Sequence, residues 1–230
     1  EQLTEKNESG TELKLTDMGD GKFSFTMPAG DVSVLASFVK EQAQEAVLPF
    51  TDVEEGAWYY DAVAYVYDKG MMTGVTDTTF EPDATTTRGM IVTMLYRLEG
   101  EPAVDNAAFA DVAAGAWYEK AVAWASQNGI VNGYGDDLFG PNDAITREQM
   151  AAILFRYAQY KGLEAVTLEE NLGAFEDAGQ ISEYAVQAFN WVVGQGLMTG
   201  VTDTTLEPAS SATRAQVATI LMRYCEALEQ

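Results

Sequence analysis

The chain has 230 residues, 47% of them hydrophobic, and its 36 acidic residues against 13 basic residues give a formal net charge of −23. That charge disfavours nucleic acid and acidic membrane surfaces as partners, and no apolar run reaches the roughly 18–20 residues that a membrane span needs. With no histidine and one cysteine, the usual zinc ligand sets and Ser-His or Cys-His nucleophile pairs are excluded, so we expect no metal and no cofactor.

The N-terminal segment differs from the rest of the chain. It starts without Met or a leader pattern, which suggests a piece of a longer polypeptide. Residues 21–39 alternate apolar and polar positions on both sides of a PAGD turn, as is typical of two antiparallel strands. Because so few strands are not stable alone, we assign 1–40 to the last strands of a preceding β-domain and 41–48 to a linker.

From residue 49 onward, one unit recurs three times. FTDVEEGAWYYDAVAYVYDKGMMTG aligns without a gap to a second copy that starts at Phe109, and with one inserted residue to a third that starts at Phe175. The agreement continues through FEPDATTTR, FGPNDAITR and LEPASSATR. We place repeat 1 at 49–100, repeat 2 at 108–160 and repeat 3 at 174–228, with polar linkers between them.

Each repeat has the pattern of helix, turn, helix. Apolar residues three and four apart mark the buried face of the first helix, and a glycine ends it. The second helix carries a longer apolar stripe, such as Met150, Ile153, Leu154 and Tyr157. Two short helices cannot bury their own faces, so the three repeats must share a core. This predicts a mainly α fold with the three long second helices as a central bundle.

The start of each second helix carries a threonine and an arginine. Capping boxes are predicted where Gln follows the threonine after three residues, at Thr146 and Thr213, and a weaker cap at Thr87, which is followed by Met90. The arginine then occupies the first helical position, where the positive end of the helix dipole disfavours a cation by a few tenths of a kcal/mol. Its recurrence in all three repeats predicts a role, at Arg88, Arg147 and Arg214.

The motif F-x-D-V, W-Y, A-V, G, G, F-x-P, T-R, followed by an apolar helix, resembles the S-layer homology domain over residues 49–228. That family occurs as a triple array that anchors proteins to Gram-positive cell walls. The resemblance implies a three-pronged, pseudo-threefold spindle around a central three-helix bundle, outside the cell at the wall or surface layer. The N-terminal strands are similar to the end of a bacterial surface β-repeat.

The resemblance also implies that grooves between the prongs bind a secondary cell-wall polysaccharide, typically through a pyruvylated sugar. By this resemblance, the three arginines named above contact the glycan, together with the aromatic residues Trp58, Trp117 and Tyr184. A carboxylate there would meet the guanidinium, the helix dipole and backbone amides that we expect to be free. An aromatic face suits the C–H side of a sugar ring. We add to the candidate site Asp52, Asp111, Gly74 and Gly133.

Structural roles stay open for the same residues. The arginines could be neutralised by Asp52, Asp111 and Asp177, the tryptophans could be core residues, and the paired glycines could serve turns. Repeat 3 departs from the pattern at Tyr184 and Ala185, so we expect competent grooves from repeats 1 and 2 and a degraded third.

An enzyme is not expected. A glycosidase needs two carboxyl groups across a deep cleft, and no carboxylate stands apart from the repeat pattern. The loop at 133–143 lacks the terminal glutamate of a calcium-binding loop. The remaining alternative is a protein-interaction or self-assembly module that contacts other surface-layer proteins.

Overall fold

The computed structural model describes residues 2–7, 16–17, 23–24, 26, 32–37, 48–105, 109–163 and 171–228. The chain divides into two units, Glu1–Ala46 and Val47–Gln230. No helix in the described stretches has the length and apolar character to cross a membrane. The predicted PAGD turn and most of the predicted linker lie outside the described residues.

The N-terminal unit contains two small antiparallel ladders among its described residues. Strand β1 (Gln2–Asn7) pairs with β4 (Val32–Ser37), in register from Gln2 opposite Ser37 to Asn7 opposite Val32. Strand β2 (Thr16–Asp17) pairs with β3 (Phe23–Ser24). Among the described residues, the strands on either side of the PAGD sequence therefore pair with other segments rather than with each other. Strand β1 offers β4 six consecutive paired residues, whereas β3 has only two described residues.

The second unit is helical, as predicted. Each repeat contributes a shorter and a longer helix, and repeat 3 adds the short 3-10 turns η1 (Ala178–Gln180) and η2 (Glu183–Ala185). The short helices are α1 (Tyr60–Asp68), α3 (Glu119–Gln127) and α5 (Val186–Gly194). The long helices are α2 (Arg88–Leu98), α4 (Arg147–Tyr160) and α6 (Arg214–Leu228).

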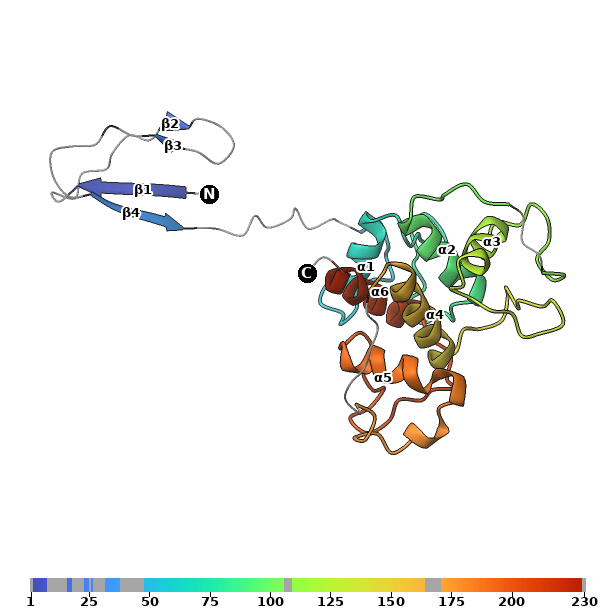
Figure 1. The fold of residues 1–230 in the computed structure, drawn as a ribbon. Helices are drawn as coiled ribbons and strands as arrows, with labels where there is room; N and C mark the ends of the chain where they lie inside the picture. The colour runs from blue at the N-terminus through green and yellow to red at the C-terminus, as the bar shows by residue number, and fades with distance from the viewer. Residues whose placement is uncertain are drawn as a thin grey trace. The chain divides into compact units, whose positions relative to one another are not determined.

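The helices pair between repeats. Each short helix packs on the long helix of the preceding repeat, α3 on α2 and α5 on α4, and α1 of repeat 1 packs on α6 of repeat 3 (Figure 1). The order of repeats therefore closes into a ring. The apolar faces are buried as the stripes predict, for example at Val63, Val66 and Ile153. Their partners come from a neighbouring repeat, so a single repeat would leave these faces exposed.

The long helices are joined near both ends. Before their N-termini, three extended segments form a cycle of backbone hydrogen bonds: Thr86 donates to Ala212 at 3.0 Å, Ala212 to Ile145 at 3.0 Å, and Ile145 to Thr86 at 2.9 Å. Toward their C-termini, Tyr157 stacks on Tyr224 and donates to Glu99. The cycle of three bonds surrounds the pseudo-threefold axis that the resemblance implies.

Candidate functional site: grooves between the repeats

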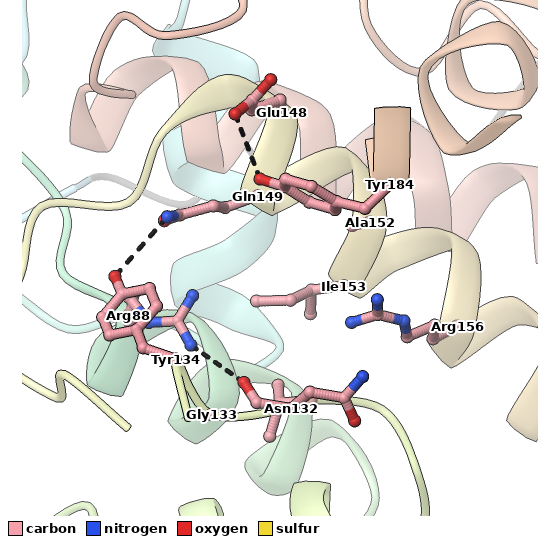
Figure 2. Close-up of a pocket in the computed structure, with 11 residues that line it drawn as sticks. Arg88, Asn132, Gly133, Tyr134, Glu148, Gln149, Ala152, Ile153, Arg156 and Tyr184 are labelled. Carbon is pink, nitrogen blue, oxygen red and sulfur yellow. Dashed lines mark hydrogen bonds between the residues drawn. The ribbon is translucent and has the colours of Figure 1, made fainter. Parts of the chain in front are cut away.

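A groove of about 450 Å³, groove 1, lies where three repeats meet. Repeat 1 contributes Arg88, repeat 2 contributes the loop 131–134 and one face of α4, and repeat 3 contributes Tyr184 (Figure 2). A smaller groove of about 250 Å³, groove 2, uses the equivalent positions one repeat earlier: Arg214, the loop 71–75 with α2, and Trp117.

The grooves thus do not belong to single repeats. Each takes its arginine, its loop and its aromatic side chain from three different repeats. The two grooves take their loop and long helix from repeats 2 and 1, and Tyr184 of repeat 3 lines the larger one. The expected difference in competence between the grooves stays a prediction.

The arginine at each helix start holds the loop of the next repeat. Arg88 is 5% exposed and donates from Nε to the carbonyl oxygen of Phe139 at 2.9 Å and from Nη2 to that of Asn132 at 3.2 Å. Its guanidinium lies over the rings of Tyr134 and Phe139, 4.4 and 4.7 Å from their centroids. The same bonds recur in the other repeats, from Arg147 to Leu206 and Thr199 and from Arg214 to Phe80 and Thr73.

The aspartates act on the other side of the same peptide. Asp111 accepts from the amides of Phe139 at 2.8 Å and Gly140 at 2.7 Å, while Arg88 donates to the carbonyl of Phe139. Burial alone would raise the pKa of Asp111, but the amide bonds and the charge of Arg88 lower it below its ordinary value. Asp52 and Asp177 accept from the equivalent amides.

These contacts correct two expectations about the aspartates. No ion pair joins them to the arginines among the described residues, so the arginines are not neutralised by direct contact with them. Asp52 and Asp111 do not line either groove, and both oxygens of each already accept a backbone amide. We conclude that they brace the loop rather than bind a ligand.

The backbone amides at the helix start are also occupied. The amide of Arg88 donates to the carbonyl of Asp143 at 3.0 Å, that of Gly89 to Pro141 at 2.9 Å, and that of Met90 to the Thr87 hydroxyl at 3.3 Å. The other two long helices repeat this arrangement. The expectation of free amides for a ligand carboxylate is therefore wrong, because the next repeat supplies carbonyl groups to them. Among the described residues, Nη1 of Arg88 is left without a partner.

The candidate aromatic side chains are exposed to solvent, whereas the candidate glycines lie in crowded backbone turns. Trp58, Trp117 and Tyr184 are 67%, 59% and 53% exposed, so they are not core residues. In contrast, a Cβ on Gly133 would lie 2.4 Å from the Leu138 carbonyl oxygen, and Gly74 is equally tight against its own loop. The two glycines therefore allow close packing within the loop.

Glu148 links two repeats at the rim of groove 1. Its carboxylate accepts from the amide and hydroxyl of Ser182, at 3.0 and 2.9 Å, and from the hydroxyl of Tyr184 at 3.1 Å. Burial and the neighbouring charge of Glu148 raise the pKa of Tyr184 to about 12. The contact orients one wall of the groove, as Figure 2 shows.

The residue that follows the first arginine of the long helix differs between repeats 1 and 2. Where repeat 2 has Glu148, repeat 1 has Gly89, whose added Cβ would lie 2.8 Å from the carbonyl oxygen of Pro141 and 3.4 Å from the ring of Tyr118. Tyr118 aligns with Ala185 in repeat 3. A side chain at position 89 would therefore meet repeat 2, whereas Glu148 has hydrogen-bond partners in repeat 3.

Sequence reasoning missed a second arginine in each repeat. Arg156 lines groove 1 and Arg97 lines groove 2. With Arg223, these residues follow the first arginine of their helix by nine positions, and together the two sets are all six arginines of the chain. The exact recurrence of that spacing in three copies was the signal in the sequence. Tyr134, stacked on Arg88, was also missed.

Comparison with known proteins gives a family match over all three repeats. A model of the S-layer homology domain matches residues 49–89, 108–151 and 174–218, more than half of the chain. An amylopullulanase of Thermoanaerobacterium thermosulfurigenes is 34% identical over 77% of this chain and 9% of its own length. An endoglucanase of Bacillus sp. (strain KSM-635) is 32% identical over 81% of this chain and 20% of its own. An S-layer protein of Bacillus thuringiensis subsp. finitimus is 29% identical over 88% and 23%. The chain spans less than a quarter of these relatives.

Proposed function

The chain belongs to the S-layer homology domain family, and on that premise we propose that it anchors a larger protein to the cell wall by binding an anionic wall glycan in its grooves. Family membership places it at the extracellular cell surface. The relatives range from S-layer proteins to glycan-degrading enzymes by name, and each shares only a small part of its length. A segment common to such different proteins fits a shared attachment role better than a shared reaction.

The observation that carries the glycan proposal is the placement of arginine. In a chain of net charge −23, the arginines occur only as two per repeat, and groove 1 contains two of them, Arg88 and Arg156. Groove 1 is thus locally cationic, which an anionic polymer needs if it is to approach so acidic a protein. Nη1 of Arg88 remains available to a carboxylate.

The other walls suit a sugar. Tyr134 and Tyr184 offer exposed aromatic surface, and Ile153 and Ala152 form an apolar floor. A volume of about 450 Å³ falls within the range of about 300–1,000 Å³ typical of small-molecule sites. We propose a pyruvylated sugar as the anionic unit, because its single carboxylate next to an apolar ring face matches this combination.

Calorimetric titration with wall polysaccharide tests the proposal. The unmodified protein is titrated with native glycan, with chemically depyruvylated glycan, and with walls treated with protease. We expect binding to survive protease and to be lost on depyruvylation. Equal binding of depyruvylated glycan would refute recognition of the pyruvyl group but not binding of the wall glycan. Loss of binding after protease treatment would favour a protein partner in the surface layer.

A further inference from the structure

The two arginines of each long helix serve different repeats. On α4, Arg147 and Arg156 are nine residues apart, which is two and a half turns, so they point to opposite sides of the helix. Arg147 is buried and bonds the loop of repeat 3. Arg156 faces groove 1, where it meets Arg88 of repeat 1. One helix thus contributes a cation to the scaffold on one side and a cation to a groove on the other.

Arg156 has no partner within the part of the chain that the structure describes. It makes no hydrogen bond and no ion pair there, although the chain has 36 acidic residues. Glu148, the carboxylate of groove 1, is already engaged by Ser182 and Tyr184. At the equivalent position of groove 2, Arg97 donates to the carbonyl of Met71 at 3.4 Å. The guanidinium of groove 1 is therefore the more available of the two.

The two cations of groove 1 face the same space. Figure 2 shows Ile153 between the guanidinium groups of Arg88 and Arg156, with Tyr184 on one side and Asn132 on the other. Burial lowers the pKa of Arg88, and the positive charge of Arg156 lowers it further despite the opposing effects of Tyr134, Asp143 and Tyr184. Two like charges over an apolar floor are stabilised when an anion lies at each of them.

We infer that groove 1 contains a second anion subsite at Arg156, so that its ligand is a saccharide carrying two acidic groups, one held at each arginine. This inference rests on the proposed function, since it assigns the first acidic group to Arg88. Arginine rather than lysine at this position favours a carboxylate or phosphate bound by two parallel hydrogen bonds.

Two synthetic disaccharides of equal size test the second subsite. Both carry a pyruvate ketal on the first sugar, and the second sugar is glucuronic acid in one and glucose in the other. Calorimetry compares the two ligands on the parent protein, on Arg156→Gln, and on the matched control Arg223→Gln, whose arginine lines neither groove. We expect the parent and the control to prefer the diacid by about tenfold, as one charge-assisted hydrogen-bonded pair allows. Arg156→Gln should bind both ligands equally.

The outcomes separate this inference from the proposed function. If the parent binds both disaccharides equally, or if Arg156→Gln keeps the preference, the second subsite is wrong while pyruvate binding stands. If the parent binds neither disaccharide, the proposed function fails and the inference fails with it. If high salt abolishes the preference of the parent and of Arg223→Gln for the diacid, that loss would further support a charge contact at Arg156.

Discussion

Replacing Arg147 by alanine should destabilise the protein, whereas the same change at Arg156 should not. Both residues lie on α4, so the two variants remove the same side chain from one helix. Arg147 is 4% exposed and donates to the carbonyl oxygens of Leu206 at 2.6 Å and Thr199 at 2.7 Å. Arg156 makes no bond to a described residue. The two variants therefore test the scaffold role of Arg147 and the proposed ligand role of Arg156 within one helix.

The magnitude follows from the bonds that are lost. Each hydrogen bond to a charged group contributes about 1.5–3 kcal/mol, and the truncation leaves two carbonyl groups of repeat 3 without their donor. Part of this is offset, because burial lowers the pKa of Arg147 and the buried cation therefore carries a desolvation cost that the variant no longer has. We expect a net loss of about 2–4 kcal/mol for Arg147→Ala and less than about 0.5 kcal/mol for Arg156→Ala.

Urea denaturation followed by circular dichroism measures both values. Since the repeats share one core and close into a ring, we expect a single transition, with the midpoint lowered only for Arg147→Ala. Glycan binding of Arg156→Ala, measured on the same samples, should fall although its midpoint is unchanged. If Arg147→Ala unfolds within about 0.5 kcal/mol of Arg156→Ala, the assignment of the first arginine to the scaffold is refuted.

Three further changes test other parts of the site. Glu148→Ala should lower the pKa of Tyr184 from about 12 toward its ordinary value, because a neighbouring anion and acceptor are removed; an absorbance titration of tyrosinate would show no shift if the contact is absent. Gly133→Ala should cost about 1–3 kcal/mol because its Cβ meets a backbone carbonyl, while the control Gly173→Ala, which has open space, should stay within about 0.5 kcal/mol in the same denaturation assay. The folded-state pKa of Asp111 is lowered, so its contribution to stability is present above the unfolded pKa of about 4 and is lost as pH falls below it. The melting temperature should therefore drop less steeply below about pH 4 in Asp111→Asn than in the parent, and parallel curves would contradict this.

Local features of the sequence predicted the helices and their ends well. The glycines that end the short helices have left-handed φ, for example +69° at Gly129, and Thr146 and Thr213 form the capping boxes. These features depend on residues three or four positions apart. The partners of each helix could not be predicted in this way, because a repeated sequence gives no information on whether a helix packs within its own repeat or on the next one.

The candidate site shows the same limit. Exposure of Trp58, Trp117 and Tyr184 agrees with the ligand role that the resemblance implies, but that role stays a proposal. The occupied amides at the helix start could not be foreseen, since the carbonyls that accept from Arg88 and Gly89 belong to Asp143 and Pro141 in the next repeat. The position of Arg156 could have been predicted from the sequence, because a side chain nine residues along a helix lies on the opposite face. The role of Glu148 could not, since its partners Ser182 and Tyr184 belong to the next repeat.

The unfavourable position of an arginine at the positive end of a helix is explained by the loop that it faces. The first amides of α2 and the side chain of Arg88 bond to carbonyl groups of one loop in repeat 2, at Asp143, Pro141, Phe139 and Asn132. The negative ends of these peptide groups face both the helix terminus and the cation, so the two positive groups share one set of acceptors rather than only repelling each other.

This arrangement also changes what the first arginine can do for a ligand. With Nε and Nη2 of Arg88 committed to carbonyls, its remaining edge is held at a fixed place in groove 1. A binding group fixed in this way loses little entropy when it takes up an anion, because the fold has already ordered it. The scaffold role of Arg88 and its proposed ligand role are therefore compatible. Because any substitution there disturbs both, the contribution of charge to binding is better measured at Arg156, which the fold leaves without a partner among the described residues.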